Sequence, residues 1–256
     1  MTTSNRIIRI FTILALLLTI NIANSTSLNT PLFDVKISDS VSPKLSHKVF
    51  DQLLKKHVSE DGLVNYKGFI IDEVILSAYL TLLSENPPKG DWTKEEKLAF
   101  WMNVYNAFTI KLIIDNYPTK SIKDIRDAWS ARFFKIGDKW YNLHDVEHKA
   151  LRKMGDPRIH FGINCASFSC PPLLNRAFKA STVNADLEFL TRRFINNQSR
   201  NTITEDSFEI SKIFQWFGKD FKMDGSLVDY LNKYSNVKIK KTAERSFKRY
   251  DWSLNE

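Results

Sequence analysis

The sequence contains little cysteine, glycine or proline. Its 256 residues include two cysteines, eight glycines and eight prolines, against eighteen Phe, eight Tyr and six Trp. Scarce glycine and proline together with plentiful aromatic residues exclude collagen-like chains and linker-rich disordered chains. No internal repeat or low-complexity tract is present. The composition therefore predicts a packed globular protein.

Long apolar runs are also scarce, and the one that stands out lies near the N-terminus. It extends from Ile10 to Ile20, follows two arginines, and is followed by the small residues Ala23 and Ser25. This order predicts a secretory signal peptide over residues 1–25. The run is about half the roughly 20 residues that span a bilayer. We expect an exported protein, periplasmic or secreted, without a transmembrane segment in its mature chain.

The missing cysteines and the charge balance restrict the partners. No cysteine precedes Cys165, which argues against a lipid anchor on an N-terminal cysteine. The net charge of +8 falls to +6 when residues 1–25 are removed, because they contain two arginines and no acidic residue. A basic, aromatic stretch over residues 238–252 has the composition of a nucleic-acid site. Export argues against nucleic acid, so a solvated face is expected, with attraction to anionic envelope polymers as the alternative.

Hydrophobic periodicity predicts a mainly helical α+β fold. A flexible leader is expected over residues 26–44, followed by a single globular domain over 45–256. Thr93 and Glu96 form a capping box at the start of a helix whose apolar residues, 98–114, cover nearly every side. Other helices are expected at 46–58, 70–83, 143–154, 184–197 and in two short pieces between 212 and 234. Hairpins are expected at 133–141 and 202–210, giving a small antiparallel sheet.

Two asparagines lie within the most apolar of these helices. Asn103 and Asn106 are three residues apart and therefore lie on neighbouring parts of one helical face. Buried carboxamides need hydrogen-bond partners. One interpretation is that both attach loops to the core. The other is that one of them orients a catalytic imidazole, as the asparagine does in Cys-His-Asn hydrolases.

A second pattern, His144-Asp145-Val146-Glu147-His148, matches the H-x-x-E-H motif of inverted zinc peptidases. That motif places two histidine ligands and a catalytic glutamate on one helix. A third ligand is required, and Cys165, Cys170, His160 and Glu188 are all candidates without a spacing that selects one. The alternative is an ordinary solvated helical face, and we expect no metal and no cofactor.

The densest group of reactive residues is the segment RIHFGINCASFSCPPL, residues 158–173. Residues 158–163 are expected to form a short strand that directs His160 and the following loop into one cleft. Cys170 and Pro171 are then expected at the start of a helix, where a thiol pKa is lowered. Either Cys165 or Cys170 could be a nucleophile. The short spacing also permits a Cys165–Cys170 disulfide, structural or redox-active, in an oxidising compartment.

Several separated motifs resemble one family, the domain of unknown function 547. They are WMNVYNAFTIKLI, Glu147-His148 with Leu151-Arg152, HFGINCASFSCPPL, SKIFQWF and YDWSLN. The resemblance as a whole runs from about His47 to Asn255. The resemblance implies an exported bacterial type but no reaction. His144 lies outside the family pattern, and Cys165 with His148 is its more general pair. The residues that match are Asn103, Asn106, Glu147, His148, Arg152, His160, Cys165, Cys170 and Pro171.

Three functional hypotheses follow. The first is a papain- or transglutaminase-like thiol hydrolase or acyltransferase of the cell envelope, with nucleophile Cys165, base His148 or His160, and Asn106 or Glu147 as orienting group. Asn103, Arg152, Cys170 and Pro171 would then contribute to binding. The second is a non-enzymatic envelope protein with a Cys165–Cys170 disulfide and an unknown substrate or protein partner. The third is a zinc hydrolase that uses His144 and His148.

Overall fold

The computed structural model describes residues 44–256. The predicted signal peptide, and the leader except for its last residue, lie outside the described residues. Over the described residues the protein is about 46% helical with two small sheets, which confirms the predicted α+β class. Among the described residues, no helix is long and apolar enough to cross a membrane.

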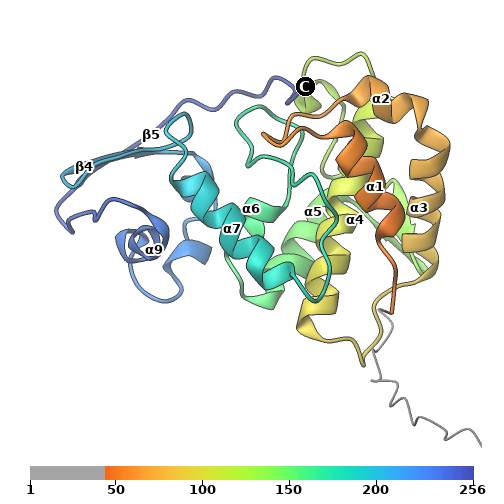
Figure 1. Ribbon diagram of the computed structural model, residues 1–256, viewed down its shortest axis with the longest axis horizontal. Helices are drawn as coiled ribbons and strands as arrows, with labels where there is room; N and C mark the ends of the chain where they lie inside the picture. Colours follow the sequence, from red (N-terminus) through yellow and green to blue (C-terminus); the bar gives the residue numbers. More distant parts are fainter. Residues whose placement is uncertain (1–43) are drawn as a thin grey trace, which may run out of the picture. The chain divides into compact units, whose positions relative to one another are not determined.

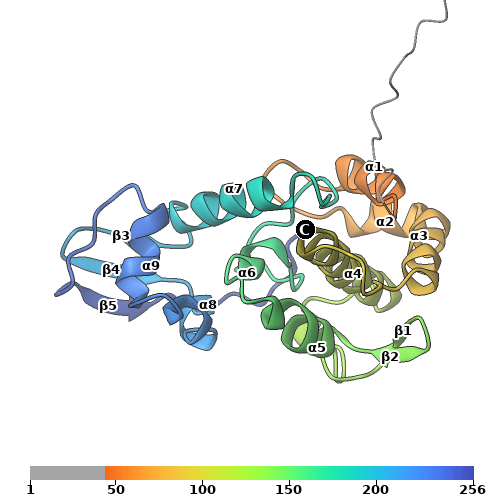
Figure 2. The ribbon, with the colours of Figure 1, turned by 90° about the horizontal axis from the view of Figure 1, so that it is seen from below.

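Helix α4, Lys94–Asp115, is the central element (Figures 1 and 2). The predicted capping box is confirmed, since Thr93 Oγ1 accepts the Glu96 N–H at 3.1 Å and the Glu96 carboxylate accepts the Thr93 N–H at 2.7 Å. Its residues from Leu98 to Ile110 are all buried, because other elements pack on every side of it. This burial explains why its apolar residues show no single face.

Three helices cover one side of α4. Helix α1, Lys48–His57, confirms the first predicted helix. The second predicted helix, 70–83, corresponds mainly to α3, Glu73–Glu85, while its first two residues belong to a separate short helix, α2, Tyr66–Ile71. The division falls at Asp72, whose carboxylate bonds to Lys56 at 2.7 Å and to His57 at 2.6 Å on α1. The break between α2 and α3 therefore coincides with contacts to α1, and the periodicity of the sequence alone does not indicate it.

A hairpin and an irregular helix cover another side of α4. Strands β1, Phe134–Ile136, and β2, Lys139–Tyr141, pair as predicted. Helix α5, Leu143–Asp145, then continues as a π-helical stretch, Val146–Leu151, and a final 3-10 turn, Arg152–Met154. The predicted helix is therefore present, with one wide turn that contains Glu147 and His148. Such π-turns are rare and recur at functional sites.

The predicted strand at residues 158–163 is wrong. Ile159–Gly162 form a short helix, α6, whose first turn is fixed where Asp156 Oδ1 accepts the Arg158 N–H at 3.0 Å. All four of its residues are buried, so the side chains give no alternating exposure, and periodicity does not separate strand from helix in so short an apolar run. Gly162 lies so near α4 that a Cβ there would be 2.8 Å from the Met102 sulfur.

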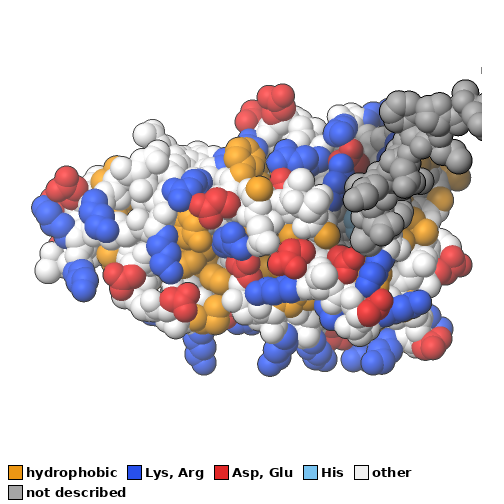
Figure 3. All heavy atoms as spheres, turned by 60° about the horizontal axis from the view of Figure 1, so that its bottom comes forward, with side chains coloured by type: hydrophobic (Ala, Val, Ile, Leu, Met, Phe, Trp, Pro, Cys, Tyr) orange, Lys and Arg blue, Asp and Glu red, His pale blue; other side chains and the backbone are white. Residues whose placement is uncertain are grey.

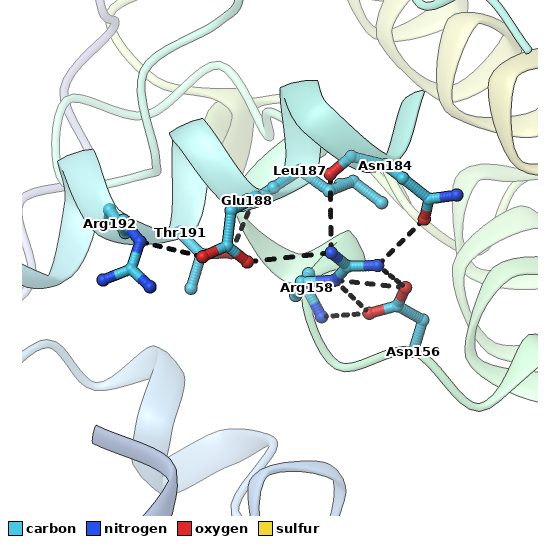
Figure 4. Close-up of polar contacts among 7 residues, drawn as sticks. All are labelled: Asp156, Arg158, Asn184, Leu187, Glu188, Thr191 and Arg192. Carbon is cyan, nitrogen blue, oxygen red and sulfur yellow. Dashed lines mark hydrogen bonds and ion pairs between the residues drawn. The ribbon is translucent and has the colours of Figure 1, made fainter. Parts of the chain in front are cut away.

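Helix α7, Val183–Ile195, packs against α6 and confirms another prediction. Polar contacts attach it to the segment before α6 (Figure 4). Arg158 donates to Asp156 at 2.7 Å and to the Asn184 side chain at 3.0 Å, and lies 3.9 Å from Glu188. Glu188 also pairs with Arg192 at 2.8 Å. Glu188, a candidate third zinc ligand by sequence, is thus part of this ion-pair network.

The remaining elements form a small layer beyond α7 (Figure 2). Strands β3, Thr202–Ile203, and β4, Ser207–Ile210, form the predicted antiparallel hairpin. Helices α8, Ile213–Trp216, and α9, Leu227–Tyr234, follow with a 3-10 turn, Asp220–Lys222, between them. Strand β5, Glu244–Phe247, pairs parallel to β4 and makes the sheet mixed. The sequence does not predict β5, because its side chains are largely exposed and show no apolar alternation.

Basic and acidic side chains are intermixed on the face drawn in Figure 3. Lys and Arg total 37 and Asp and Glu total 29, so the positive excess is modest relative to the number of charges. On that face the basic side chains are not collected into one uninterrupted stripe.

Candidate functional site

A cavity of about 110 Å³ lies where α4, the π-helical stretch, α6 and the C-terminal segment meet. One side is aromatic: Trp216, Tyr250 and Trp252 pack with ring centroids 4.6 to 5.7 Å apart. Trp216 is 46% exposed, so this aromatic side extends to the surface. The polar or ionisable side chains that line the cavity are Tyr105, Glu147, His160, Cys165, Cys170 and Tyr250.

The loop that presents Cys165 is fixed by a buried amide. Asn164 Oδ1 accepts the Ala166 N–H at 2.8 Å, and Asn164 Nδ2 donates to the Pro171 carbonyl at 2.8 Å. Asn255 Nδ2 donates to the same Oδ1 at 3.2 Å, which joins the loop to the C-terminus. Ala166 has φ +60°, a left-handed conformation that costs a non-glycine residue about 1–2 kcal/mol. The surrounding hydrogen bonds therefore impose the turn beside Cys165.

Cys165 and Cys170 are both free thiols, with their sulfurs 3.1 Å apart. The Cys165 sulfur is also 3.1 Å from Ser167 Oγ and 3.6 Å from the Tyr250 hydroxyl. The hydrogen bond from Cys170 leads the causes that lower the pKa of Cys165 to about 6, with Ser167 and Tyr250 adding to it against burial. Burial raises the pKa of Cys170 well above its ordinary value. At neutral pH this pair consists of a thiolate at Cys165 and a thiol at Cys170.

The prediction that Cys170 and Pro171 begin a helix is wrong. No helix includes residues 163–182, and the backbone from Pro171 to Leu174 is irregular. Cys170 is buried instead, where its sulfur accepts the Cys165 N–H at 3.1 Å. The thiol pKa is therefore lowered at Cys165 by neighbouring hydrogen-bond donors, and no helix dipole takes part.

A series of polar side chains extends from buried His160 in the cavity to the partly exposed Asp220 and Arg152. His160 Nε2 lies 2.8 Å from Asp220 Oδ2, and the His160 ring is 1% exposed. Arg152 pairs with the same carboxylate through two hydrogen bonds of 2.6 and 2.7 Å. Burial would raise the pKa of Asp220, but hydrogen bonds from Arg152 and His160 hold it below its ordinary range. Asp220 is thus ionised and accepts the Nε2–H of His160. The other ring nitrogen of His160, Nδ1, is the one that faces Glu147.

Glu147 is the one carboxyl side chain among the described residues that line the cavity of Cys165. Its Oε1 lies 3.8 Å from His160 Nδ1, too far for a direct hydrogen bond. Burial raises the pKa of Glu147 to about 7, and the negative charge at Cys165 adds to the shift. A carboxyl group that titrates near neutrality can donate or accept a proton at working pH. Glu147 and Cys165 therefore combine an acid with a thiolate in one cavity.

His148 contacts Arg152 and does not line the cavity. Arg152 Nη1 is 2.6 Å from His148 Nδ1, and because guanidinium only donates, Nδ1 is the acceptor and the ring is neutral. Burial lowers the pKa of His148 to about 4, and charges at His144 and Arg152 add to the shift. The His144 and His148 rings stack at 4.1 Å. Within residues 44–256, no group of three or more His, Cys, Asp or Glu is arranged so that it could bind a metal ion.

Asn103 and Asn106 both bond to backbone. Asn103 bonds to the carbonyl and N–H of Phe178 at 2.9 and 3.0 Å. Asn106 donates to the Gly162 carbonyl at 3.0 Å and accepts the Asn164 N–H at 2.9 Å. Both ends of each amide are used in this way, which matches the loop-attaching interpretation. Asn106 fixes the backbone immediately before Cys165.

We expect Asn103→Ala and Asn106→Ala to destabilise the fold alike, and only Asn106→Ala to affect Cys165. Each truncation leaves two buried backbone groups unpaired, at a cost on the order of 1–3 kcal/mol. Urea unfolding would measure the loss of stability and iodoacetamide the reactivity of Cys165. Equal reactivity of Cys165 in the two variants would contradict a positioning role for Asn106.

Four residues of the site were not selected from the sequence. Asp220 follows the SKIFQWF motif, but nothing in its spacing relates it to His160, which is 60 positions earlier. Tyr250 was assigned to the basic C-terminal stretch. Ser167 and Asn164 lie between selected residues, and only their hydrogen bonds distinguish them. A local signal existed for Asn164 alone, because an asparagine before a tight turn commonly bonds to the backbone two residues on.

Comparison with known proteins gives one match. Residues 90–195 match the model of the family described as protein of unknown function, DUF547. The matched segment begins before α4 and ends with α7, and it includes Glu147, His160, Cys165 and Cys170. Asp220 and Tyr250 lie outside it. No curated protein matches the chain. No solved structure matches it.

Proposed function

We propose that this DUF547 domain-containing protein is a thiol-dependent hydrolase or acyltransferase. The family description names no reaction, so the proposal rests on the side chains that line the cavity. One observation supports this most directly. Cys165, whose pKa is lowered to about 6, lines the same cavity as Glu147, whose pKa is raised to about 7. Opposed shifts in one cavity separate a nucleophile from a proton donor.

The first half-reaction forms a thioester. The Cys165 thiolate attacks the acyl carbon of an ester or amide, and a carbon–sulfur bond forms. The bond to the leaving oxygen or nitrogen breaks, and its electron pair departs with the leaving group. Glu147, protonated beside a thiolate, gives its proton to that group. The product is an acylated Cys165 and a Glu147 carboxylate.

The second half-reaction releases the acyl group. Water, or an acceptor hydroxyl or amine, attacks the thioester while Glu147 removes its proton. The carbon–sulfur bond breaks, the thiolate is restored, and Glu147 is protonated again. Water as acceptor gives hydrolysis, and another nucleophile gives acyl transfer.

His160 acts in this proposal as a positioning residue for Glu147. Asp220 accepts its Nε2–H, and Arg152 neutralises the charge of Asp220. The hydrogen bond to Asp220 fixes the orientation of the imidazole ring, so that Nδ1 faces Glu147. His148 is the weaker candidate, because its Nδ1 is used by Arg152 and its side chain does not line the cavity. The pair Cys165 and Glu147, supported by His160, replaces a direct Cys-His pair.

The thiolate itself is tested by alkylation. In reduced protein we expect iodoacetamide to modify Cys165 with a rate that rises through about pH 6, while Cys170 stays unmodified because it is buried. Cys170→Ala should move the inflection to higher pH, since it removes the hydrogen bond that lowers the pKa of Cys165 most. Mass spectrometry of tryptic peptides follows both thiols. An inflection near the ordinary thiol value of about 8.5 would refute the activated thiolate.

We also propose that the protein is exported and acts in the cell envelope. The arginines, apolar run and small residues within 1–25 support this. Expression of the full chain in a bacterial host should give a periplasmic protein whose intact mass lacks residues 1–25. Full-length protein confined to the cytoplasm would contradict export while leaving the chemistry of Cys165 open to the alkylation test.

A further inference from the structure

A second cavity lies beside the cavity of Cys165, and Tyr250 lines both. With a volume of about 20 Å³, it admits one small polar group and excludes a sugar ring or a peptide segment. Its lining differs sharply from the aromatic side of the first cavity. Besides Tyr250, it consists of hydroxyl and cationic side chains, among them Ser169, Ser211, Arg200, Lys212, Lys248 and Arg249.

Three separate segments bring these four cations together. Arg200 precedes β3, Lys212 precedes α8, and Lys248 and Arg249 follow β5. The Lys248 N–H donates to the Ile210 carbonyl at 2.9 Å, which holds the end of β5 beside the end of β4. Figure 2 shows these three strands and α8 at the same end of the molecule. The grouping is therefore a product of the mixed sheet.

The four cations lack acidic partners within the described residues. Their side chains form no ion pair there, and Lys248 Nζ donates instead to the Gln198 carbonyl at 3.3 Å. Hydrogen bonds from the Ser253 N–H and hydroxyl, at 2.9 and 2.8 Å, lower the pKa of the Asp251 carboxylate most, and the charges of Arg200 and Arg249 add only to that effect. Uncompensated positive charge in a concave site attracts anions.

Arg200 is the strongest indication that a ligand belongs here. Its guanidinium lies 4.5 Å from the centre of the Phe168 ring, and its Nε is buried without a hydrogen-bond partner. Buried donors in proteins are nearly always satisfied, so an unpaired guanidinium N–H requires an explanation. A planar guanidinium donates well to the oxygens of phosphate or carboxylate.

We infer that this cavity binds one anionic group, a phosphate or a carboxylate, of the acyl compound that reacts at Cys165. The binding of the anion stands on Arg200 and its neighbours alone, and its assignment to the acyl substrate rests on the proposed function. Because Tyr250 lines both cavities, the acyl carbon and the anionic group of such a compound would be only a short chain apart.

Anion binding is tested with inorganic phosphate and with acetate, by calorimetry at constant low ionic strength. At least one should bind saturably, and the one that binds identifies the group. Lys248→Gln with Arg249→Gln should weaken binding about tenfold, as expected for lost charge-assisted hydrogen bonds. Arg200→Gln should do the same, and Lys238→Gln with Lys241→Gln, a matched charge change on exposed lysines, should not. No binding, or equal loss in the matched pair, would overturn the inference.

Substrate assignment needs a second measurement. The ratio of kcat/KM for p-nitrophenyl hydrogen glutarate to that for p-nitrophenyl butyrate compares an anionic with a neutral ester of similar length. The Lys248→Gln, Arg249→Gln protein should lower this ratio about tenfold relative to the Lys238→Gln, Lys241→Gln protein. Phosphate or acetate binding without ester cleavage would remove the proposed function and leave an anion site. Ester cleavage with an unchanged ratio would leave the enzyme and remove the inferred substrate class.

Discussion

Cys165→Ala is expected to abolish the burst of p-nitrophenolate that the reduced protein releases from p-nitrophenyl acetate. In the intact protein the thiolate takes the acetyl group and one equivalent of p-nitrophenolate appears before steady turnover begins. Alanine offers no nucleophile, so the acylation rate should fall by about three orders of magnitude or more. Stopped-flow absorbance measures the burst, and intact mass shows the acetylated enzyme.

Cys170→Ala is the matched control for this result. It removes the neighbouring sulfur, and the burst should persist. The burst should be slower at pH 6, because the pKa of Cys165 loses its largest lowering contribution. A burst that survives Cys165→Ala, or an acetyl group found on Cys170, would refute Cys165 as the nucleophile. Hydrogen bonds hold the two residues in the same loop, so far-UV circular dichroism of both variants is needed to show that each remains folded.

The sequence predicts the helices of this fold well because capping and periodicity are local. Thr93, Glu96 and the apolar run behind them specify α4 without reference to the rest of the chain. The strand expected at residues 158–163 fails for a tertiary reason. All four residues of α6 are buried by tertiary contacts, and such a segment shows neither a two-residue nor a 3.6-residue period.

Strand β5 shows the opposite difficulty. Glu244, Arg245 and Ser246 are exposed, and the strand exists because its backbone pairs with β4 across more than thirty intervening residues. Pairing of this kind is backbone chemistry that a side-chain pattern does not record. The second cavity depends on that pairing, so the sequence predicts only a solvated face over residues 238–252.

The candidate site could be predicted in part. Glu147, His160, Cys165 and Cys170 were selected from residue type and motif, and all four line the same cavity. Their relations could not be predicted, because each depends on a contact distant in sequence. Asp220 fixes His160, while Tyr250 bonds to the Cys165 sulfur from 85 positions away. The lowered pKa of Cys165 also has a different origin from the helix terminus expected at Cys170.

Glu147→Gln is expected to separate the two half-reactions. With p-nitrophenyl acetate the leaving group departs as an anion and needs no proton, so the burst should remain. Release of the acetyl group needs a base to accept the proton of water, and this step should slow by about 10²- to 10⁴-fold. The measured result would be a full burst followed by a nearly flat steady state. Equal losses in burst and turnover would instead indicate that Glu147 only supports the shape of the cavity.

The variant should not lose its fold, which makes the kinetic result interpretable. Because burial raises the pKa of Glu147 to about 7, the folded protein binds its proton more tightly than the unfolded chain. The wild type therefore loses stability as pH rises from the ordinary pKa of a glutamate toward about 7. The Glu147→Gln protein does not lose this stability, because glutamine is always neutral. We expect thermal unfolding of the variant to match wild type at low pH and to exceed it above neutrality.

The pH dependence of turnover provides the sharpest test of Glu147 as base. Deacylation should accelerate as pH rises, since only the carboxylate accepts a proton, and the inflection should vanish in Glu147→Gln. In the acyl-enzyme the Cys165 sulfur is uncharged, which removes one contribution that raises the pKa of Glu147 while burial remains. The deacylation inflection should therefore lie below about 7, whereas acylation rises through about 6 with the Cys165 thiolate. A deacylation inflection that persists in the glutamine variant would assign the base to another group, with His160 the first to be substituted.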